Sequence, residues 1–258
     1  MSEMLNKIYN EDCLEGMKRI PDGSIDMILC DLPYGTTQNK WDSIIPLEML
    51  WVEYSRIIKE NGAIVLTAQT PFDKVLGVSN LKMLKYEWIW DKRVGTGFLN
   101  SKRMPLKSHE NILVFYKKPP TYNPQMTDAK PENIRPLGIG SQTSTNYGKV
   151  ESLKASDGYD TSKRFPKTVL EYSKNDKELN SLNRLHPTQK PVVLFEYLIK
   201  TYTNEGETVL DNCMGSGTTA IAAIKTGRNY IGFELDETYH KLATERISDH
   251  TSQMELIL

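Results

Sequence analysis

Short apolar segments that suit buried strands alternate with helical segments at both ends of this chain, and this alternation constrains its fold most. Residues 25–30 form such a segment near the N-terminus, and residues 208–210 and 230–233 form two more near the C-terminus. Short apolar runs bounded by turn-forming residues are typical of strands buried on both faces. The alternation predicts an α/β fold, with a doubly wound, mostly parallel sheet covered by helices on both faces.

The same patterns predict the full order of elements. Strands are expected at residues 7–10, 25–30, 63–67, 86–90, 111–116, 208–210 and 230–233. Helices are expected at residues 13–20, 46–60, 71–81, 192–202, 216–225 and 237–246. Asn61-Gly62 is the expected stop of the second helix, and Asp236 is the expected N-cap of the last.

The middle of the chain does not continue this alternation. Residues 118–184 are rich in Pro, Gly, Ser, Thr and Asn and have little apolar periodicity. A length of 258 residues fits one domain. We therefore expect a single domain over residues 1–258, with an irregular insertion at residues 118–184.

Short apolar runs and few cysteines exclude several classes of protein. The runs at residues 27–30 and 63–66 are far shorter than the ~20 residues that cross a bilayer, and the first residues lack the apolar stretch of a signal peptide. Cys13, Cys30 and Cys213 show no metal-binding spacing, and their odd number suits a reducing compartment. We expect a cytoplasmic protein with neither a membrane partner nor a metal ion.

The net charge of −1 hides an uneven distribution of charge. Residues 92–190 contain 18 Lys and Arg against 9 Asp and Glu, a net charge of +9, whereas the rest of the chain carries −10. Aromatic residues lie among these basic clusters, and this mixture suits a nucleic-acid backbone and its unstacked bases. A solvated, loop-rich surface would have the same composition, so composition alone leaves both interpretations open.

A glycine-rich turn follows the first of the C-terminal strands and leads into a helical segment. It reads Asp211-Asn-Cys-Met-Gly215-Ser-Gly217, and Glu234 ends the next expected strand. Glycines let a backbone approach a ligand closely, and an acid placed like Glu234 can accept hydrogen bonds from two ribose hydroxyls. The spacing Gly215-x-Gly217-x-x-Ala220 also matches a dinucleotide fingerprint. Asp211 would repel a pyrophosphate but suits the ammonium and sulfonium of S-adenosylmethionine, which is therefore the favoured cofactor.

A second polar loop, Asp31-Leu-Pro-Tyr34-Gly, follows the buried segment at residues 25–30. The amino nitrogen of adenine is a poor nucleophile because its lone pair is delocalised into the ring. Hydrogen bonds to Asp31 and to a main-chain carbonyl would hold this nitrogen in line with a methyl sulfonium, and the carboxylate would stabilise the developing positive charge. Tyr34 would stack on a base rotated out of the duplex. A turn with a capping Asp and a core Tyr is the alternative interpretation.

Both loops leave the carboxyl ends of buried strands, where open parallel sheets bind ligands. With the Asp31 loop first, the basic segment in the middle and the glycine loop last, the sequence resembles the DNA amino-methyltransferases that modify N4 of cytosine or N6 of adenine, in the motif order of the β class. The resemblance covers nearly the whole chain. It implies a Rossmann-like methyltransferase sheet with one antiparallel strand, S-adenosylmethionine as cofactor, double-stranded DNA as substrate and target recognition by residues 118–184. It also implies frequent homodimers, and a cognate restriction enzyme is an open prediction.

The resemblance assigns roles residue by residue. The catalytic motif is matched by Asp31, Pro33 and Tyr34. The cofactor site is matched by Asp12, Cys13, Thr188, Lys190, Asp211, Cys213, Gly215, Gly217 and Glu234. Thr188 and Lys190, in the stretch His-Pro-Thr-Gln-Lys-Pro, are expected near the cofactor carboxylate, although a rigid linker is the alternative there. Asp12 is expected near the cofactor adenine, and it is equally suited to N-cap the following helix.

Basic residues of the middle segment are the expected DNA contacts. They are Lys92, Arg93, Lys102, Arg103, Lys107 and His109 near one strand end, and Lys163, Arg164 and Arg184 farther along the chain.

Two positions depart from the family pattern, and several functions stay open. Leu32 stands where the family often has Pro, and Cys213 stands where it commonly has Phe. The catalytic motif begins with Asp31, as is usual for the adenine enzymes, so N6-adenine is the predicted target and N4-cytosine the alternative. A nicotinamide-dependent oxidoreductase and a non-catalytic nucleic-acid binder are the other hypotheses, and RNA is an alternative substrate.

Overall fold

The computed structural model describes residues 1–35, 43–134, 143–144, 148–149, 160–173 and 189–255. These residues divide into two compact units. The larger unit comprises Met1–Asn123 and Thr168–Leu258, and the smaller comprises Pro124–Lys167. The 118–184 segment, expected to be one insertion, thus contributes residues to both units.

An eight-stranded sheet forms the larger unit, in the order β1-β12-β11-β2-β3-β5-β4-β10. The strands are β1 (Lys7–Asn10), β2 (Ile25–Asp31), β3 (Ile58–Ala68), β4 (Leu84–Thr96), β5 (Lys107–Phe115), β10 (Val169–Glu171), β11 (Thr208–Asp211) and β12 (Asn229–Glu234). β5 runs antiparallel to both of its neighbours, β3 and β4. Every other pair in this sheet is parallel. The expected mostly parallel sheet with one antiparallel strand is therefore confirmed.

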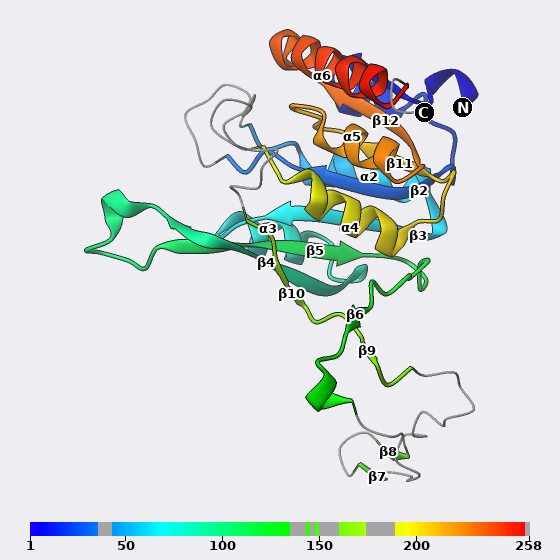
Figure 1. Cartoon of the computed structure of the whole chain (residues 1–258). Coiled ribbons are helices and arrows are strands. Elements are labelled where there is room, and N and C mark those ends of the chain that lie inside the picture. Colours follow the sequence, from blue (N-terminus) through cyan, green and yellow to red (C-terminus); the bar gives the residue numbers. More distant parts are fainter. Residues whose placement is uncertain (36–42, 135–142, 145–147, 150–159, 174–188, 256–258) are drawn as a thin grey trace. The chain divides into compact units, whose positions relative to one another are not determined.

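Helices cover both faces of this sheet (Figure 1). They are α1 (Cys13–Met17), α2 (Leu47–Ile57), α3 (Phe72–Ser79), α4 (Val192–Tyr202), α5 (Thr218–Lys225) and α6 (Glu237–Glu255). The larger unit also contains two short 3₁₀ helices, η1 (Ser2–Met4) and η2 (Phe98–Asn100). Alternate residues of β2 point to opposite faces: Ile28 packs with α1, α2 and α3, whereas Leu29 packs with α4 and α5. Because helices cover both faces of β2, its sequence is a nearly continuous apolar run, as predicted.

The second helix ends earlier than the sequence predicts. α2 stops at Ile57, β3 begins at Ile58, and Asn61-Gly62 lies inside the strand instead of stopping a helix. Ile58 is buried and pairs with Ile25, and the register between β2 and β3 then shifts. Pairing with β2 thus overrides the local turn signal. The first helix is also shorter than expected, because α1 ends at Met17.

Strand β10 was not predicted from the sequence. Its three residues pair with β4 in parallel, with Leu170 buried in the core. A strand of three residues inside a polar segment carries too little periodicity to be found from sequence. The smaller unit contains two antiparallel pairs, β6 (Thr127–Asp128) with β9 (Lys163–Arg164) and β7 (Thr143–Ser144) with β8 (Gly148–Lys149), and the 3₁₀ helix η3 (Pro131–Asn133).

Beyond the sheet, β4 and β5 continue into a projecting two-stranded arm (Figure 1), which we define as residues 93–107. The strands pair in constant register from Tyr86 and Val114 to Asp91 and His109, and they meet again at Thr96 and Lys107. η2 lies in the connection. Across the parts of the chain that the structure describes, no helix is long and apolar enough to span a bilayer.

Candidate active site

The carboxyl ends of β2, β11 and β12 border one cavity of about 620 Å³ in the larger unit. β11 lies between the other two strands, so Asp31 at the end of β2 and Asp211 at the end of β11 line the same cavity. Glu234, at the end of β12, also lines it. This volume is typical of a site for a small molecule. The two loops identified in the sequence therefore converge.

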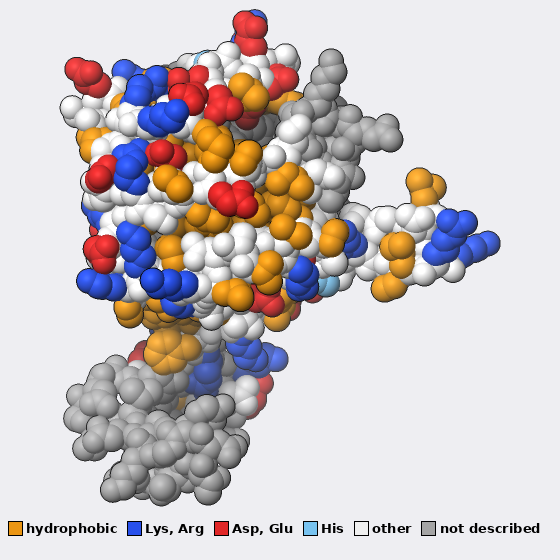
Figure 2. All heavy atoms as spheres, turned by 180° about the vertical axis from the view of Figure 1, so that it is seen from behind, with side chains coloured by type: hydrophobic (Ala, Val, Ile, Leu, Met, Phe, Trp, Pro, Cys, Tyr) orange, Lys and Arg blue, Asp and Glu red, His pale blue; other side chains and the backbone are white. Residues whose placement is uncertain are grey.

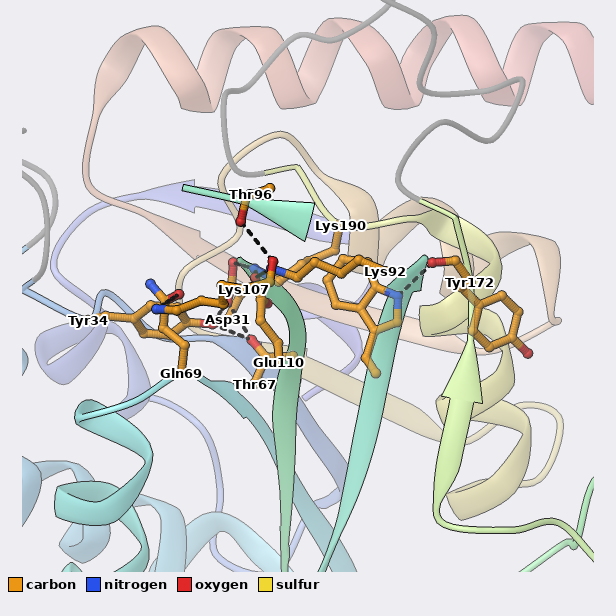
Figure 3. A network of polar contacts seen from close by, with 11 residues as sticks. Asp31, Tyr34, Thr67, Gln69, Lys92, Thr96, Lys107, Glu110, Tyr172 and Lys190 are labelled. Atoms are coloured by element: carbon orange, nitrogen blue, oxygen red, sulfur yellow. Dashed lines mark hydrogen bonds and ion pairs between the residues drawn. The ribbon is translucent and has the colours of Figure 1, made fainter. Parts of the chain in front are cut away.

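The carboxylate of Asp31 is bonded on both of its oxygens (Figure 3). Tyr34 donates its hydroxyl to Oδ1 at 2.6 Å, and Thr67 on β3 donates to the same oxygen. Lys190 Nζ lies 2.5 Å from Oδ2. Burial, followed by the charge of Asp31, raises the pKa of Tyr34 well above its usual value, so this hydroxyl keeps its proton and remains a donor.

Lys190 lines the cavity and belongs to a buried chain of alternating charges. Its Nζ lies 3.4 Å from Glu110 Oε2, and Glu110 also pairs with Lys92. Burial alone would lower the pKa of Lys190, but the carboxylates of Asp31 and Glu110 outweigh it and raise that pKa. Lys190 therefore carries its positive charge beside Asp31. The expectation that it lies near the cofactor carboxylate did not foresee these partners.

The ring of Tyr34 forms one wall beside Asp31. It stacks on Phe72 of α3 with the centroids 5.5 Å apart, and Lys190 Nζ lies 5.7 Å from its centroid. Pro33 lines the cavity next to it. Leu32, the departure from the family pattern, is buried and joins the core under α1, α2 and α3.

At the other end of the cavity, Asp211 organises the glycine loop. Its Oδ1 accepts the Cys213 N–H at 3.0 Å, and its Oδ2 accepts the Thr219 hydroxyl at the start of α5. Burial raises its pKa to about 6, and these hydrogen bonds partly offset the shift. Gly217 has φ +80°, and a Cβ there would lie 3.3 Å from the Ala243 side chain, so this close turn requires glycine.

Two further carboxylates predicted for the cofactor are already held by backbone N–H groups. Glu234 accepts from Gly215 at 2.7 Å and from Asp236 at 2.9 Å, and burial raises its pKa. Asp12 Oδ1 accepts from the N–H groups of Leu14 and Glu15, so it is the N-cap of α1. Asp12 also lines the cavity, and the two interpretations of this residue are compatible.

Asn212, which the sequence analysis missed, links the two predicted cysteines of the cavity. Its Nδ2 lies 3.6 Å from Cys13 Sγ and 3.4 Å from Cys213 Sγ, and its Oδ1 accepts the Tyr54 hydroxyl at 2.5 Å. The Cys13 thiol donates to Cys213, and this hydrogen bond, followed by burial, raises the pKa of Cys13; the pKa of Cys213 is raised as well. Both thiols therefore stay neutral, as small apolar groups in the wall.

The sequence analysis also missed Thr67, Glu110 and the role of Lys92. Thr67 is a buried hydroxyl inside a strand that reads as an apolar run, and it carries no local signal. Glu110 did carry one, because it is the sole acidic residue between residues 92 and 127 of the sequence. An isolated acid within a basic stretch indicates a buried partner for a cation.

The predicted DNA contacts on the larger unit lie in different surroundings. Lys92 is 2% exposed and paired with Glu110, so its burial does not suit a phosphate contact, and this expectation is corrected. Arg93 is exposed and pairs with Glu171 at 2.5 Å. Lys107 is exposed and donates to Gln69 at 3.1 Å. The remaining exposed residues of this group are Lys102, Arg103 and His109.

The smaller unit holds two more predicted contacts. Lys163 pairs with Asp128 at 2.5 Å, and Arg164 donates to the carbonyl of Thr161 at 2.7 Å. Both residues thus hold parts of this unit together. Arg184 and Thr188 lie outside the described residues.

Carboxylates outnumber cations around the cavity. Among the residues that the structure describes, seven acidic side chains and two lysines line it. The acidic residues are Glu11, Asp12, Asp31, Glu110, Asp211, Glu234 and Asp236, and the lysines are Lys92 and Lys190. Within the same described residues, no group of His, Cys, Asp or Glu is arranged to hold a metal ion.

Known proteins resemble this chain along most of its length. The family described as DNA methylase, of the N6 and N4 type, matches residues 25–245. Type II methyltransferase M1.MboII of Moraxella bovis is 28% identical over 91% of this chain and 94% of its own length. DNA adenine methyltransferase YhdJ of Escherichia coli is 26% identical over 96% of this chain and 85% of its own length.

Solved structures share the fold. M1.HpyAVI in complex with SAM superposes with a TM-score of 0.62 at 22% identity, covering 93% of this chain and 98% of that chain. The cytosine-N4-specific PvuII DNA methyltransferase superposes with a TM-score of 0.61 at 16% identity, covering 96% of this chain and 91% of that chain. The proteins similar to this chain thus include a DNA adenine methyltransferase by sequence and a cytosine-N4-specific enzyme by fold.

Proposed function

This chain belongs to the DNA methylase family, and from that premise we propose that it transfers a methyl group from S-adenosylmethionine to the N6 amino group of adenine in double-stranded DNA. One observation carries the proposal. Asp31, held by Tyr34 and Lys190, lines the same cavity as Asp211 and Glu234 at the neighbouring strand ends. A base bound at Asp31 and a cofactor bound at the glycine loop would share that cavity.

The cavity fits S-adenosylmethionine, which supplies an electrophilic methyl group when bound. Seven carboxylates line the cavity against two lysines, and both lysines are already paired with carboxylates. This surplus of negative charge suits a ligand with an ammonium and a sulfonium and repels a pyrophosphate, so it disfavours a nicotinamide cofactor. Glu234 would accept from the ribose hydroxyls, and Asp211 would attract the cationic end.

Asp31 orients and activates the amino group of the base. Each carboxylate oxygen has two lone pairs. Oδ1 already accepts from Tyr34 and Thr67, whereas Oδ2 accepts from Lys190 and can also accept an N–H of the base. Hydrogen bonding to the carboxylate favours a pyramidal nitrogen and stabilises the positive charge that develops on it. Tyr34 presents its ring to the face of the extruded base.

The carboxylate of Asp31 is positioned by a chain of three charged residues, Lys190, Glu110 and Lys92. Lys190 pairs with Oδ2 and fixes its position, which leaves the arriving amine a defined acceptor. Glu110 balances the charge of Lys190 from the other side, and Lys92 balances Glu110. We regard these three as positioning residues, since they act through Asp31.

Asp31 supports adenine as the target, in keeping with the family pattern. The fold is shared with a cytosine-N4-specific enzyme, and cytosine presents an equivalent exocyclic amine. N4-cytosine methylation is therefore the competing outcome of the same chemistry.

DNA from a bacterial host that lacks its own methylation and expresses this chain tests the proposal. Digestion to nucleosides and mass spectrometry should give N6-methyladenine, and sequencing of modified bases should give the recognition motif. N4-methylcytosine alone would overturn the choice of base. The absence of both, together with calorimetric binding of a nicotinamide cofactor in place of S-adenosylmethionine, would overturn the function.

The remaining partner assignments are predictions. Target recognition by residues 118–184, homodimerisation and a cognate restriction enzyme rest on the family resemblance, as does a cytoplasmic location.

A further inference from the structure

We propose that the tip of the arm is an apolar wedge that enters the base stack of duplex DNA and fills the space left by an extruded base. The inference rests on the proposed function, and it concerns the arm of residues 93–107, whose tip is η2 with the turn that follows it. Neither the exposed hydrophobic residues of the tip nor their arrangement is needed for the chemistry at Asp31.

The tip displays large apolar side chains to solvent. Phe98 is 79% exposed and Leu99 is 99% exposed, and Met104 on the same turn is also exposed. Figure 2 shows hydrophobic and basic side chains side by side on the projecting arm. Since these side chains contribute nothing to the core, their position on the far end of a projection indicates contact with a partner.

The backbone of the tip is ordered by its own hydrogen bonds. The N–H of Asn100 donates to Gly97 at 2.9 Å, that of Ser101 donates to Phe98 at 3.0 Å, and that of Arg103 donates to Asn100 at 2.8 Å. Gly97 has φ +88°, which permits the sharp entry into η2. The apolar side chains are thus presented on a preformed turn, so little conformational entropy would be lost when a partner orders them.

The charge around the tip fits a polyanion. Lys102 and Arg103 are exposed and lie shortly after η2. Lys107 and Arg93, which pairs with Glu171, stand at the base of the arm. Residues 92–109 contain no acidic residue. Basic side chains next to an apolar tip match the phosphates that flank an opened base step.

The arm begins at the cavity that would receive the base. Thr96 lines that cavity and donates its hydroxyl to the Lys107 carbonyl at 3.0 Å, which closes the base of the arm (Figure 3). Lys107 Nζ donates to Gln69, another residue of the cavity wall. A duplex that places one base at Asp31 therefore has the arm beside the step from which the base came. Apolar wedges hold such a step open by replacing the lost stacking.

The experiment uses a duplex that carries the motif found by sequencing, with 2-aminopurine beside the target adenine to report unstacking by fluorescence. The full chain with Phe98→Ser and Leu99→Ser should methylate the matched duplex about tenfold more slowly than wild type, because the stacking contribution is lost. The same variant should methylate at nearly the wild-type rate when the target base is mismatched, since that step is already open. Its fluorescence rise on binding the matched duplex should be smaller.

Two further variants separate the wedge from other roles. Val78→Ser removes another strongly exposed apolar residue, 66% exposed on α3, and should leave both rates unchanged. Lys102→Ala with Arg103→Ala should weaken binding and flatten its salt dependence without loss of the fluorescence rise at saturation.

Three results would overturn the wedge. They are wild-type rates on the matched duplex, an equal loss on matched and mismatched duplexes, and a wild-type dimer that becomes monomeric in sedimentation when the tip is changed. A wild-type chain that methylates no DNA would instead overturn the proposed function, so the two failures are distinguishable.

Discussion

The two ends of the cavity hold their carboxylates in opposite ways. At the β2 end, Asp31 pairs with Lys190, and Glu110 pairs with Lys190 and Lys92. At the β11 and β12 end, Asp211 and Glu234 accept from backbone N–H groups, and Asp211 also accepts from neutral side chains such as the Thr219 hydroxyl. The first end is balanced in charge, whereas the second carries carboxylates without a paired lysine among the described contacts.

This difference matches what each end would bind. A nucleobase is neutral, so a carboxylate that serves it can be fixed by cations without repelling the ligand. A cofactor with a sulfonium and an ammonium is cationic, and a lysine at that end would oppose it. One cavity can therefore receive two ligands of different charge because its ends satisfy their acids with different donors.

The largest expected effect comes from Asp31→Ala at the balanced end. Methyl transfer should fall by about a thousandfold, because the acceptor that orients the amine and stabilises its charge is removed. Binding of S-adenosylmethionine, measured by calorimetry, should change little, since the glycine-loop end is untouched. Turnover close to wild type would contradict the role given to Asp31.

Glu110→Gln tests the lysine chain at the same end. Removing this buried charge leaves Lys92 without a carboxylate, and the free energy of unfolding should fall by about 3 kcal/mol. Lys92→Met combined with Glu110→Gln should recover most of that loss, because replacing both members of a buried pair is often neutral. Urea denaturation provides the measurement. A double variant no more stable than the single one would show that Lys92 and Glu110 are not coupled.

Asp211→Asn tests the unbalanced end and should have opposite effects on stability and binding. The pKa of Asp211 is raised to about 6, so the folded chain holds this proton more tightly than the unfolded chain. Its contribution to stability is present below about pH 4 and is lost as the pH rises through 6. The variant should therefore exceed wild type in stability by about 2 kcal/mol at pH 8, but not at pH 4.

Binding supplies the second measurement on this variant. Affinity for S-adenosylmethionine should fall in Asp211→Asn, and in wild type it should fall as the pH drops through about 6. A variant that is less stable than wild type at pH 8 would argue against the burial cost at this position.

The smallest effects are expected at Asp12, where capping and binding can be separated. Asp12→Asn keeps a good N-cap for α1 and should leave the melting temperature unchanged, while a weaker affinity for the cofactor would reveal the charge. Asp12→Ala removes the cap and should cost about 1 kcal/mol of stability. If Asn and Ala lower the affinity equally and neither alters stability, the cap has no energetic role.

Local sequence patterns were enough to predict the core of the fold and the two loops that line the cavity. The apolar run of β2 and the strand, glycine turn and helix around Asp211 depend on neighbours in sequence, and both were predicted at nearly the observed bounds. The ion pairs were not predictable in this way. Lys190 and Asp31 meet across 159 positions, and the burial of Lys92 depends on Glu110 in the adjacent strand.

The same limit explains the errors in secondary structure. Asn61-Gly62 is a strong turn signal, yet pairing of Ile58 with Ile25 extends β3 through it. β10 has three residues, and only its neighbour β4 reveals it as a strand. In each case a partner far away in sequence decides the conformation, and no window of sequence contains that partner.

The short strand β10 has a consequence for how such a chain can change. Residue Asn123 is fixed to the end of α4 through the Thr201 carbonyl at 2.8 Å, and Thr168 just before β10 accepts from Ile89 of β4 at 2.8 Å. Both Asn123 and Thr168 belong to the larger unit, and residues 124–167 connect them in the sequence. Lengthening such a span adds only slowly to the entropy of closing it. The sequence of residues 124–167 can therefore change or lengthen while the cavity keeps its strands, its charges and its chemistry.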